Sequence, residues 1–381
     1  MNWLKKTMAD VAGTQEPIYG PSAIQPVTAQ SPNHSVLTRD DLRWKGMNST
    51  NVENQVFYVT TASGHVVMAQ LIYSNVAGLH TTCQFNSKIF YPKDAAGKPT
   101  KEHLWCSTPL SNFQFDDTKH SVKADNCSIT LSADGNSYSI KSTVSKDTVV
   151  DLTFTRAAPG FVAGADGTSH FGTDPQKPWG SMRHAIWPRC HATGTFTTRT
   201  DGPLDVRGTG VFVHALQGMK PHHAAARWNF CNWHGPTHSA ILMSYTTPPS
   251  YGSTVVSVGC LCTDDALLWA GAQGASVEHT AIKGDPDVSW PEPGAVSYKW
   301  AGQSAAGKEV SAELAGDLGQ RTDRVDVMAE VPKFVKQIVA GAAGTRPYIY
   351  QWITKLTLKG TDGETAINEE GDLFMEATFI S

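Results

Sequence analysis

The sequence predicts an all-β protein with two consecutive antiparallel β-barrels, and three observations support this. Most of the chain consists of short runs rich in β-branched and aromatic residues, which are separated by Gly, Asp and Pro turns. Asp-Gly pairs lie between these runs and supply the positive-φ positions that tight hairpins need. The length of 381 residues is long for one hydrophobic core and fits two domains of ordinary size.

The first barrel is expected in residues 45–217, after a helix and linker in residues 1–44. Its expected strands are residues 55–60, 65–73, 81–90, 126–131, 137–143, 148–155 and 193–200. Asp-Gly turns fall among them at Asp134-Gly135, Asp166-Gly167 and Asp201-Gly202. This is the pattern of an antiparallel barrel with short connections.

The second barrel is expected in residues 218–381, because the strand pattern breaks near Gln217. A second series of runs begins near Gly208. Its strands are residues 211–215, 227–234, 239–246, 254–263, 267–271, 296–301, 355–359 and 373–379. An Asp362-Gly363 pair predicts a hairpin before the last of these strands.

Two segments have helical periodicity instead. Residues 331–340 carry an apolar stripe, with Pro332 in the first turn and Gly341 after the end. At the N-terminus, Leu4 and Met8 share one face with Trp3 beside them. This helix either docks on the first barrel or lies in a membrane surface, where an indole and lysines suit the headgroup zone.

Composition narrows the class of partner. A formal charge of −4 without basic runs argues against nucleic acid as the main partner. The sequence shows neither a bilayer-length apolar stretch nor a signal-peptide core with its cleavage site. The seven cysteines are scattered, which favours reduced thiols packed as small apolar groups. We therefore expect a soluble, cytoplasmic protein.

Several segments together resemble the fungal survival factor one family. The resemblance runs through MNWLKKTMADVAGTQEPIYGP at the start, LIYSNVAGLHTTCQFNSKIF at 71–90, GTDPQKPWGSMRHAIWPRC at 172–190, DRVDVMAEVPKFVK at 323–336, GTRPYIYQ at 344–351 and the ending EATFIS. It implies two lipocalin-like barrels, a role in oxidative-stress survival and movement of ceramide between membranes. It also favours the membrane-surface interpretation of the N-terminal helix, through Trp3, Leu4 and Met8.

The sequence departs from the pattern of that family in one region. Typical members read roughly N-F-x-x-F-Q-x-P-x-Y-S-A, then M-E before T-T-P-P-S-Y-G-S-T, then V-N-V-G-G-I. The differing positions here are Trp233, His234, His238, Ser244, Ser257, Cys260 and Leu261. Because these changes alter charge and hydrogen-bond donors, they indicate a relative with a new ligand.

Aromatic residues with polar edges are concentrated in two segments and suggest a pocket between the barrels. The expected substrate-binding residues are Trp179, Arg183, His184, Trp187, Trp228, Tyr245 and Tyr251. Such rings can bury an apolar molecule and hold it by a few hydrogen bonds. They can equally fill the space between two barrels. A guanidinium between indoles, as at Arg183, must find an acceptor or stack on a ring.

The histidines do not form a recognisable metal motif. His222 and His223 are adjacent, so on a strand they would face opposite sides, and a structural role is favoured. His234 and His238 lie on either side of Gly235-Pro236, and this pattern predicts a hairpin turn with one histidine at each end. No third ligand and no HExxH or CxxC pattern accompanies them, and the sequence lacks a phosphate loop and a dinucleotide fingerprint. We expect neither a metal nor a cofactor.

Two functions of different class follow. The altered region favours a cofactor-free cycloaddition enzyme of hetero-Diels–Alder type, which joins a terpene to a polyketide-derived quinone-methide-like partner. His238, His234 and Trp233 would then be its catalytic hydrogen-bond donors. The alternative is a ceramide-binding transfer protein in the cytoplasm, with reversible, peripheral contact at ER and Golgi membranes. Both functions use an apolar small molecule and an enclosed cavity.

Overall fold

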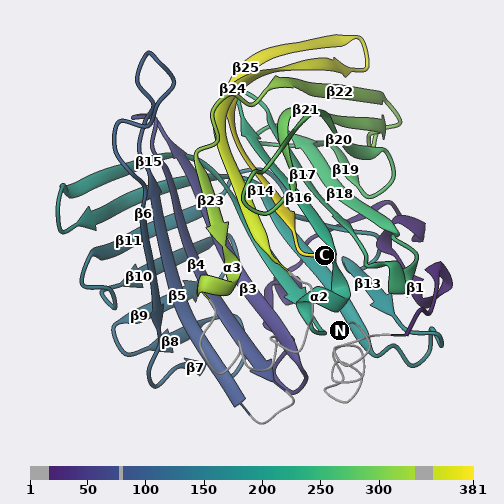
Figure 1. Cartoon of the computed structure of the whole chain (residues 1–381), viewed down its shortest axis with the longest axis horizontal. Coiled ribbons are helices and arrows are strands. Elements are labelled where there is room, and N and C mark those ends of the chain that lie inside the picture. The colour runs from purple at the N-terminus through teal and green to yellow at the C-terminus, as the bar shows by residue number, and fades with distance from the viewer. Residues whose placement is uncertain (1–16, 77–79, 331–345) are drawn as a thin grey trace.

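The computed structural model describes residues 17–76, 80–330 and 346–381, and strands make up most of them. Two antiparallel sheets lie side by side, and each curls around its own core (Figure 1). The expected all-β fold with two lipocalin-like barrels is confirmed. The expected helices in residues 1–12 and 331–340 lie outside the described residues.

The first sheet is formed by β1 (Ile24–Gln25), β2 (His34–Val36), β3 (Asn51–Thr61), β4 (Val66–Val76), β5 (His80–Phe90), β6 (Leu104–Pro109), β7 (Gln114–Phe115), β8 (Val122–Ala124), β9 (Cys127–Leu131), β10 (Ser137–Ser142), β11 (Thr148–Arg156), β12 (Phe161–Ala163), β13 (Thr168–Phe171), β14 (Gly180–Thr198) and β15 (Gly202–Gln217). Its main path runs β6-β5-β4-β3-β15-β14-β11-β10-β9-β8-β7. Strands β3 and β15 are therefore neighbours although most of the sheet separates them in sequence.

The second sheet is formed by β16 (Arg227–His234), β17 (Ser239–Thr246), β18 (Val255–Cys262), β19 (Leu267–Gly271), β20 (Ala275–Gly284), β21 (Pro291–Gln303), β22 (Glu309–Asp317), β23 (Asp323–Asp326), β24 (Tyr348–Asp362) and β25 (Thr365–Phe379). Its path is β19-β18-β17-β16-β25-β24-β22-β21-β20, with β23 paired to β24. Two short helices are described, α2 (Pro221–Ala224) and α3 (Val327–Glu330), together with 3₁₀ turns Pro21–Ala23, Val27–Ala29, Arg39–Leu42 and Pro249–Tyr251.

The Asp-Gly turns expected from the sequence connect strands in the structure. Gly135, Gly167, Gly202 and Gly363 all have positive φ, of 72°, 82°, 75° and 59°. Each turn joins two consecutive strands, for example β14 and β15 at Gly202. Glycine adopts this backbone region without the steric penalty that a Cβ would bring.

Some strands were not expected, notably β6, β20 and β22. β22 has the sequence EVSAELAGD, in which Ala, Ser and Gly weaken the local strand signal. Its residues nevertheless alternate between buried and exposed over most of its length, because β21 and β24 pair with it on either side. Tertiary pairing overrides a weak local preference here.

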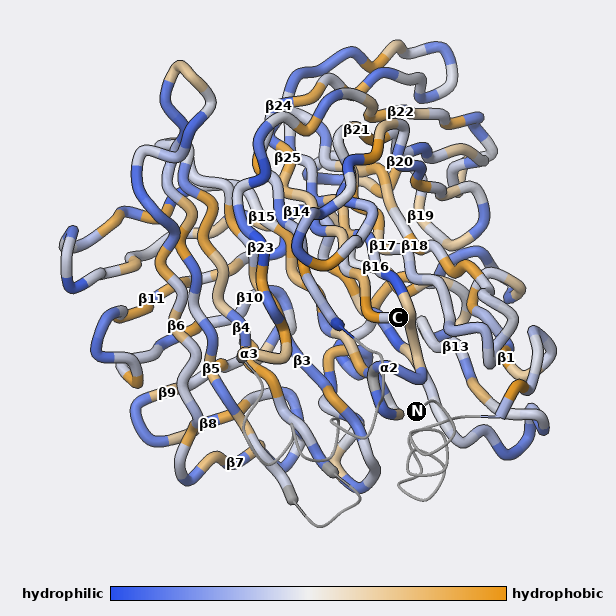
Figure 2. Tube along the Cα trace, viewed as in Figure 1, coloured by the Kyte–Doolittle hydropathy of each residue, from blue (hydrophilic) through white to orange (hydrophobic). Residues whose placement is uncertain are grey.

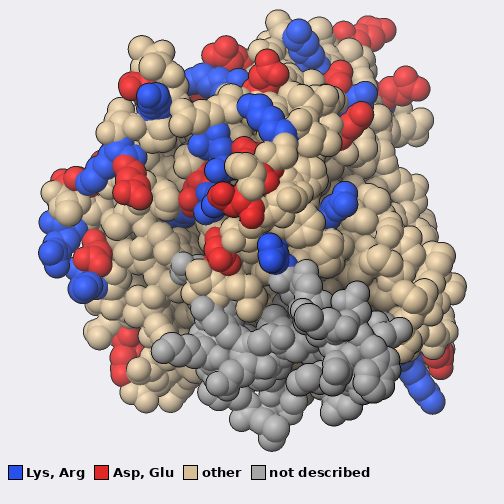
Figure 3. All heavy atoms as spheres, viewed as in Figure 1, with Lys and Arg blue, Asp and Glu red and all other residues tan. Residues whose placement is uncertain are grey.

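Three clusters of buried apolar residues hold the molecule together. One lies inside each curled sheet, and the third lies between the two sheets. Figure 2 shows apolar residues along the strands and hydrophilic residues mainly at the turns. Among the described residues, none of the helices is both long and apolar enough to span a bilayer. On the face in Figure 3, basic and acidic side chains are interspersed.

Candidate functional site

The candidate site is the seam, which we define as the layer of side chains between the two sheets. Strand β3 sends Val56 and Tyr58 into the seam, whereas Phe57 enters the core of the first barrel. Strand β16 likewise sends Phe230 to the seam and Trp233 into the second core. Because side chains alternate along a strand, sequence neighbours in the expected site are sent to different compartments.

Three of the expected substrate-binding residues meet in the seam. His184 of β14 lies 5.9 Å from Trp228 and 6.5 Å from Tyr245, measured between ring centroids, and Trp228 lies 5.2 Å from Tyr245. Burial lowers the pKa of His184 to about 4, with a further contribution from the positive charge of Arg183. Burial also raises the pKa of Tyr245 above its usual range. This cluster therefore offers neutral ring nitrogens and a neutral phenol.

Trp179 and Tyr251 lie together at another part of the seam. The indole nitrogen of Trp179 donates to the Tyr251 hydroxyl at 3.0 Å, and Tyr19 packs on Trp179 with ring centroids 4.9 Å apart. Trp179 is 44% exposed, whereas Tyr251 is fully buried. These rings connect the seam to the surface.

Arg183 and Trp187 face the first barrel instead of the seam. The Arg183 guanidinium is buried and donates to the Asp41 carboxylate at 2.8 Å and to the Asp166 carbonyl at 2.9 Å. Trp187 is fully buried and packs on Tyr138, with ring centroids 5.2 Å apart. The guanidinium of Arg183 therefore donates to a carboxylate and to carbonyls, and it forms a buried ion pair with Asp41.

The three residues expected to be catalytic are held by three different partners. Trp233 is fully buried in the second core, where its indole nitrogen donates to the Leu356 carbonyl at 3.0 Å. His234 Nδ1 is 2.6 Å from the Ser239 hydroxyl, and His238 Nδ1 is 2.7 Å from the Glu369 carboxylate. The structure does not gather these groups around one point.

The hairpin expected at 234–238 is present, because β16 ends at His234 and β17 begins at Ser239. Arg189 of β14, which the sequence did not single out, binds this hairpin. Its guanidinium donates to the carbonyls of Pro236 at 2.9 Å and His238 at 3.0 Å, to the Ser239 hydroxyl at 2.8 Å and to Asp264 at 2.6 Å. The only local signal was an arginine within a buried aromatic strand.

A second polar group in the seam was also missed. The Lys88 ammonium is buried, donates to the Gln351 side chain at 2.7 Å and pairs with Asp323. Gln351 donates onward to Glu376, which also accepts from the Tyr58 hydroxyl at 3.2 Å. Burial raises the pKa of Glu376. These residues lie on β3, β5, β23, β24 and β25, so only the fold brings them together.

Asn232 of β16 is a third polar residue that the sequence did not single out, after Arg189 of β14 and Lys88 of β5. Its side chain is fully buried, and neither end of its amide has a hydrogen-bond partner among the described residues. His234 Nε2 is buried and unpartnered in the same part of the molecule. Burying a polar group without a hydrogen-bond partner costs free energy. Such groups therefore indicate positions where a ligand or a water molecule could supply the missing hydrogen bonds.

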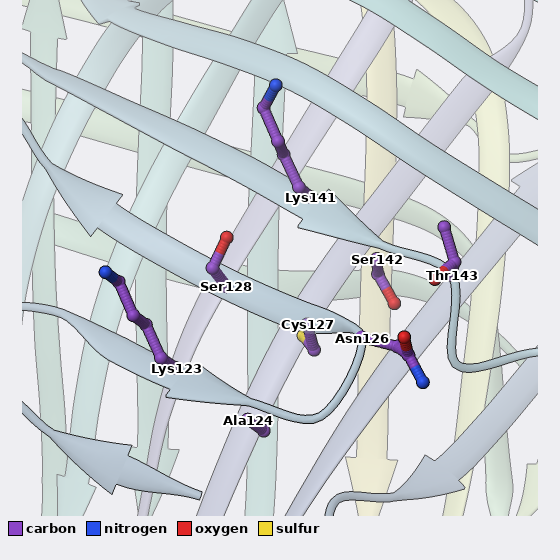
Figure 4. Close-up of a pocket in the computed structure, with 8 residues that line it drawn as sticks. All are labelled: Lys123, Ala124, Asn126, Cys127, Ser128, Lys141, Ser142 and Thr143. Atoms are coloured by element: carbon purple, nitrogen blue, oxygen red, sulfur yellow. The ribbon is translucent and has the colours of Figure 1, made fainter.

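Two cavities described for the molecule lie away from the seam. One of about 380 Å³ is lined by residues of β8, β9 and β10 and their turns, including Lys123, Ser128 and Lys141 (Figure 4). Another of about 110 Å³ lies beside Tyr91 and Asp201. In the described ranges no group of three or more His, Cys, Asp or Glu side chains is placed to hold a metal ion.

The chain is similar along its whole length to fungal proteins that are named ceramide-binding. The chain is 57% identical over 384 residues to the ceramide-binding protein svf-1 of Neurospora crassa, covering 100% of this chain and 99% of that protein. It is 55% identical over 403 residues to the ceramide-binding protein svf1 of Aspergillus fumigatus, covering 100% of both chains.

A solved structure shares the fold at much lower sequence identity. Kievitone hydratase from Nectria haematococca superposes with a TM-score of 0.55 and 12% identity, covering 96% of this chain and 98% of that one. At this identity the likeness concerns the fold alone. The sequence pattern of the Svf1 family matches residues 1–381, and with these close relatives it establishes that the chain belongs to the Svf1 family.

Proposed function

We propose that this protein binds ceramide, with the seam between its barrels as the site that receives the lipid. The observation that carries the proposal is identity of more than half the residues, along the entire chain, to proteins named ceramide-binding. Ceramide has an uncharged polar head and long apolar chains. A binding site for it needs apolar walls and a few neutral hydrogen-bonding groups.

The chemistry of the seam supports this choice. Its apolar part consists of buried aliphatic and aromatic side chains from both sheets. Its polar groups include the neutral imidazole of His184 and the phenol of Tyr245, with Trp228 half-buried beside them. Neutral donors and acceptors suit the hydroxyl and amide groups of ceramide, because they need no counter-charge when water is excluded.

Lipid extraction tests the proposal directly. Protein purified from a eukaryotic host should carry long-chain ceramide detectable by mass spectrometry, and Trp228→Ala should reduce the amount bound by about tenfold. The matched control is Trp290→Ala, because Trp290 is also half-buried but stacks on Phe379 in the second barrel. Equal loss in both variants, or no ceramide in the wild type, would refute this site or this function respectively.

The cycloaddition enzyme is retained as a second candidate. It is favoured by the neutral donors His184 and Tyr245, since a pericyclic reaction needs an oriented donor in a water-poor setting. Against it, Trp233 and His238 already have partners within the protein. If these residues are catalytic, His238→Ala and Trp233→Phe should each slow product formation by about 10²–10³. Unchanged turnover would remove them from the site.

We further propose reversible contact with membrane surfaces through the N-terminal residues Trp3, Leu4 and Met8, which lie outside the described residues. The support is the amphipathic pattern of the sequence. Replacing Leu4 and Met8 with Asp should abolish flotation with liposomes while thermal stability stays nearly constant. Loss of stability with unchanged flotation would show that the segment packs on the barrels.

A further inference from the structure

The interior of the first barrel contains a row of buried polar side chains that is separate from the seam. Glu53 and Gln55 of β3 and His214 of β15 are each at most 1% exposed. Glu53 accepts hydrogen bonds from the backbone N–H groups of Lys45 at 2.9 Å and Gly46 at 2.7 Å, and its carboxylate is 2.9 Å from His214 Nε2. The carboxylate therefore has partners on both of its oxygens.

Four other polar atoms of this interior have no partner. They are Trp44 Nε1, Gln55 Oε1, Trp187 Nε1 and His214 Nδ1, and each is buried without a hydrogen bond to any described residue. Their side chains are all at most 1% exposed. The ring nitrogens of Trp44 and Trp187 can only donate, whereas the Gln55 oxygen can only accept.

These four side chains form one continuous band. Gln55 and His214 are directly opposite each other on paired strands, and the rings of Trp44 and His214 are 5.1 Å apart. The Gln55 amide donates to the Tyr138 hydroxyl at 3.3 Å, and the ring of Tyr138 lies 5.2 Å from that of Trp187. The unpartnered atoms therefore belong to side chains that follow one another from Trp44 through His214, Gln55 and Tyr138 to Trp187 inside one barrel.

Four unpartnered polar atoms in one barrel interior are more than ordinary core packing would leave. Each buried polar atom without a partner costs stability, and four such atoms together cost as much as a sizeable part of the net stability of a typical domain. Opposite His214 on β14 stands Ala185, a small residue in a row of large ones. The neighbouring ionised groups already have partners, because Glu53 binds two backbone N–H groups and His214 Nε2, and Arg183 pairs with Asp41. A group that satisfies these four atoms must be neutral and must both donate and accept hydrogen bonds.

We propose that this band is a binding site for hydroxyl groups inside the first barrel. A hydroxyl accepts from an indole N–H and donates to an amide oxygen or to imidazole Nδ1, which matches all four atoms. Ordered water and the hydroxyl groups of a lipid headgroup share this chemistry. The lipid source rests on the proposed ceramide binding, but it places the headgroup in this band instead of beside His184 and Tyr245 in the seam. The water source requires no lipid.

High-resolution crystal structures of the full chain, prepared lipid-free and with short-chain ceramide, test the site. We expect oxygen density within hydrogen-bond distance of Trp44 Nε1, Gln55 Oε1 or Trp187 Nε1. Density in the lipid-free crystal supports water as the source, and its replacement by the headgroup supports the lipid. An interior packed only with carbon atoms in both crystals overturns the proposal.

A solution experiment separates the site from the function. Gln55→Leu should weaken binding of short-chain ceramide about tenfold and should not further weaken binding of 1-deoxyceramide, which lacks one hydroxyl. Thr153→Leu, a polar-to-leucine change on the exposed outer face of β11 in the same barrel, is the matched control. If Gln55→Leu does not fold, Trp187→Phe replaces it, because it removes one donor and keeps the aromatic ring.

The outcomes are distinguishable. If wild-type protein binds ceramide and neither variant changes the preference between the two lipids, the headgroup does not occupy this band, and only water in the crystal can sustain the proposal. If wild-type protein binds no ceramide, the proposed function fails, and the lipid-free crystal alone decides the site. Absence of oxygen density in the band, together with unchanged ceramide binding by Gln55→Leu, would refute the proposal.

Discussion

The effect of burial in the seam is clearest for its histidines. Burial lowers the pKa of His184 to about 4 and that of His234 to about 3, helped by the positive charges of Arg183 and Arg189. Both side chains are at least nine-tenths buried. They therefore enter the fold as neutral imidazoles, which is the form that suits an uncharged ligand.

The same shift makes stability depend on pH. Both histidines have folded-state pKa values below the usual 6.5, so below about pH 6.5 the unfolded chain binds protons first. The free energy of unfolding should be at its plateau above pH 6.5 and fall by roughly 1.4 kcal/mol per pH unit and per histidine as the pH drops towards 4. Urea unfolding at pH 7 and pH 5 measures this.

His184→Gln provides the control for that measurement. It removes one titrating group, so the loss between pH 7 and pH 5 should shrink relative to the wild type. An identical pH profile for wild type and variant would show that His184 is not neutral in the folded protein, or that its burial is relieved by water.

At the scale of elements, the hairpin between β16 and β17 is fixed by a residue of the other sheet. Arg189 lies next to the irregularity in the pairing of β14 with β15, where the register shifts between Trp187 and Cys190. A bulge turns a side chain away from its regular direction. Here it accompanies a guanidinium that satisfies the carbonyls of the turn at 236 and 238.

Removing that guanidinium should cost more than an ordinary surface change. Arg189→Met leaves the carbonyls of Pro236 and His238 without their donor, so we expect a loss of about 3 kcal/mol in the free energy of unfolding. Arg207→Met on neighbouring β15 is the control, because Arg207 is exposed, and it should change stability by less than about 0.5 kcal/mol. Equal losses would contradict the role given to Arg189.

The whole molecule is held together by the seam. Strands β3, β14 and β15 have one face in the first core and the other against the second sheet, and β16 and β17 have the corresponding arrangement. Tyr58 reaches across to Phe374 with ring centroids 4.8 Å apart, and Lys88 reaches Gln351. Neither sheet could lose its partner without exposing a broad apolar face.

Unfolding should therefore be a single event. The chain division near Gln217 remains our proposal for the boundary between the barrels, but we expect neither part to be stable alone. Calorimetry should give one transition, and circular dichroism and tryptophan fluorescence should report the same urea midpoint. Two separated transitions, or residues 218–381 folding by themselves with dispersed NMR signals, would be evidence for independent barrels.

Many strands and their tight turns could be predicted from sequence because their determinants are local. β16, β17 and β19 match their expected runs, and Gly135 and Gly202 stand where hairpins require a positive φ. Alternation of apolar and polar residues indicates a strand with two different faces. Family membership, too, was encoded in segments spread along the chain.

The assignment of faces was decided only by the tertiary structure. Trp233 and His234 are adjacent, yet one lies in the second core and the other on the seam side, and Arg183 and His184 are separated in the same way. Period-two alternation says that neighbours diverge, but not which compartment each enters. That depends on pairings such as β3 with β15 and on the packing of one sheet against the other, which no short stretch of sequence contains.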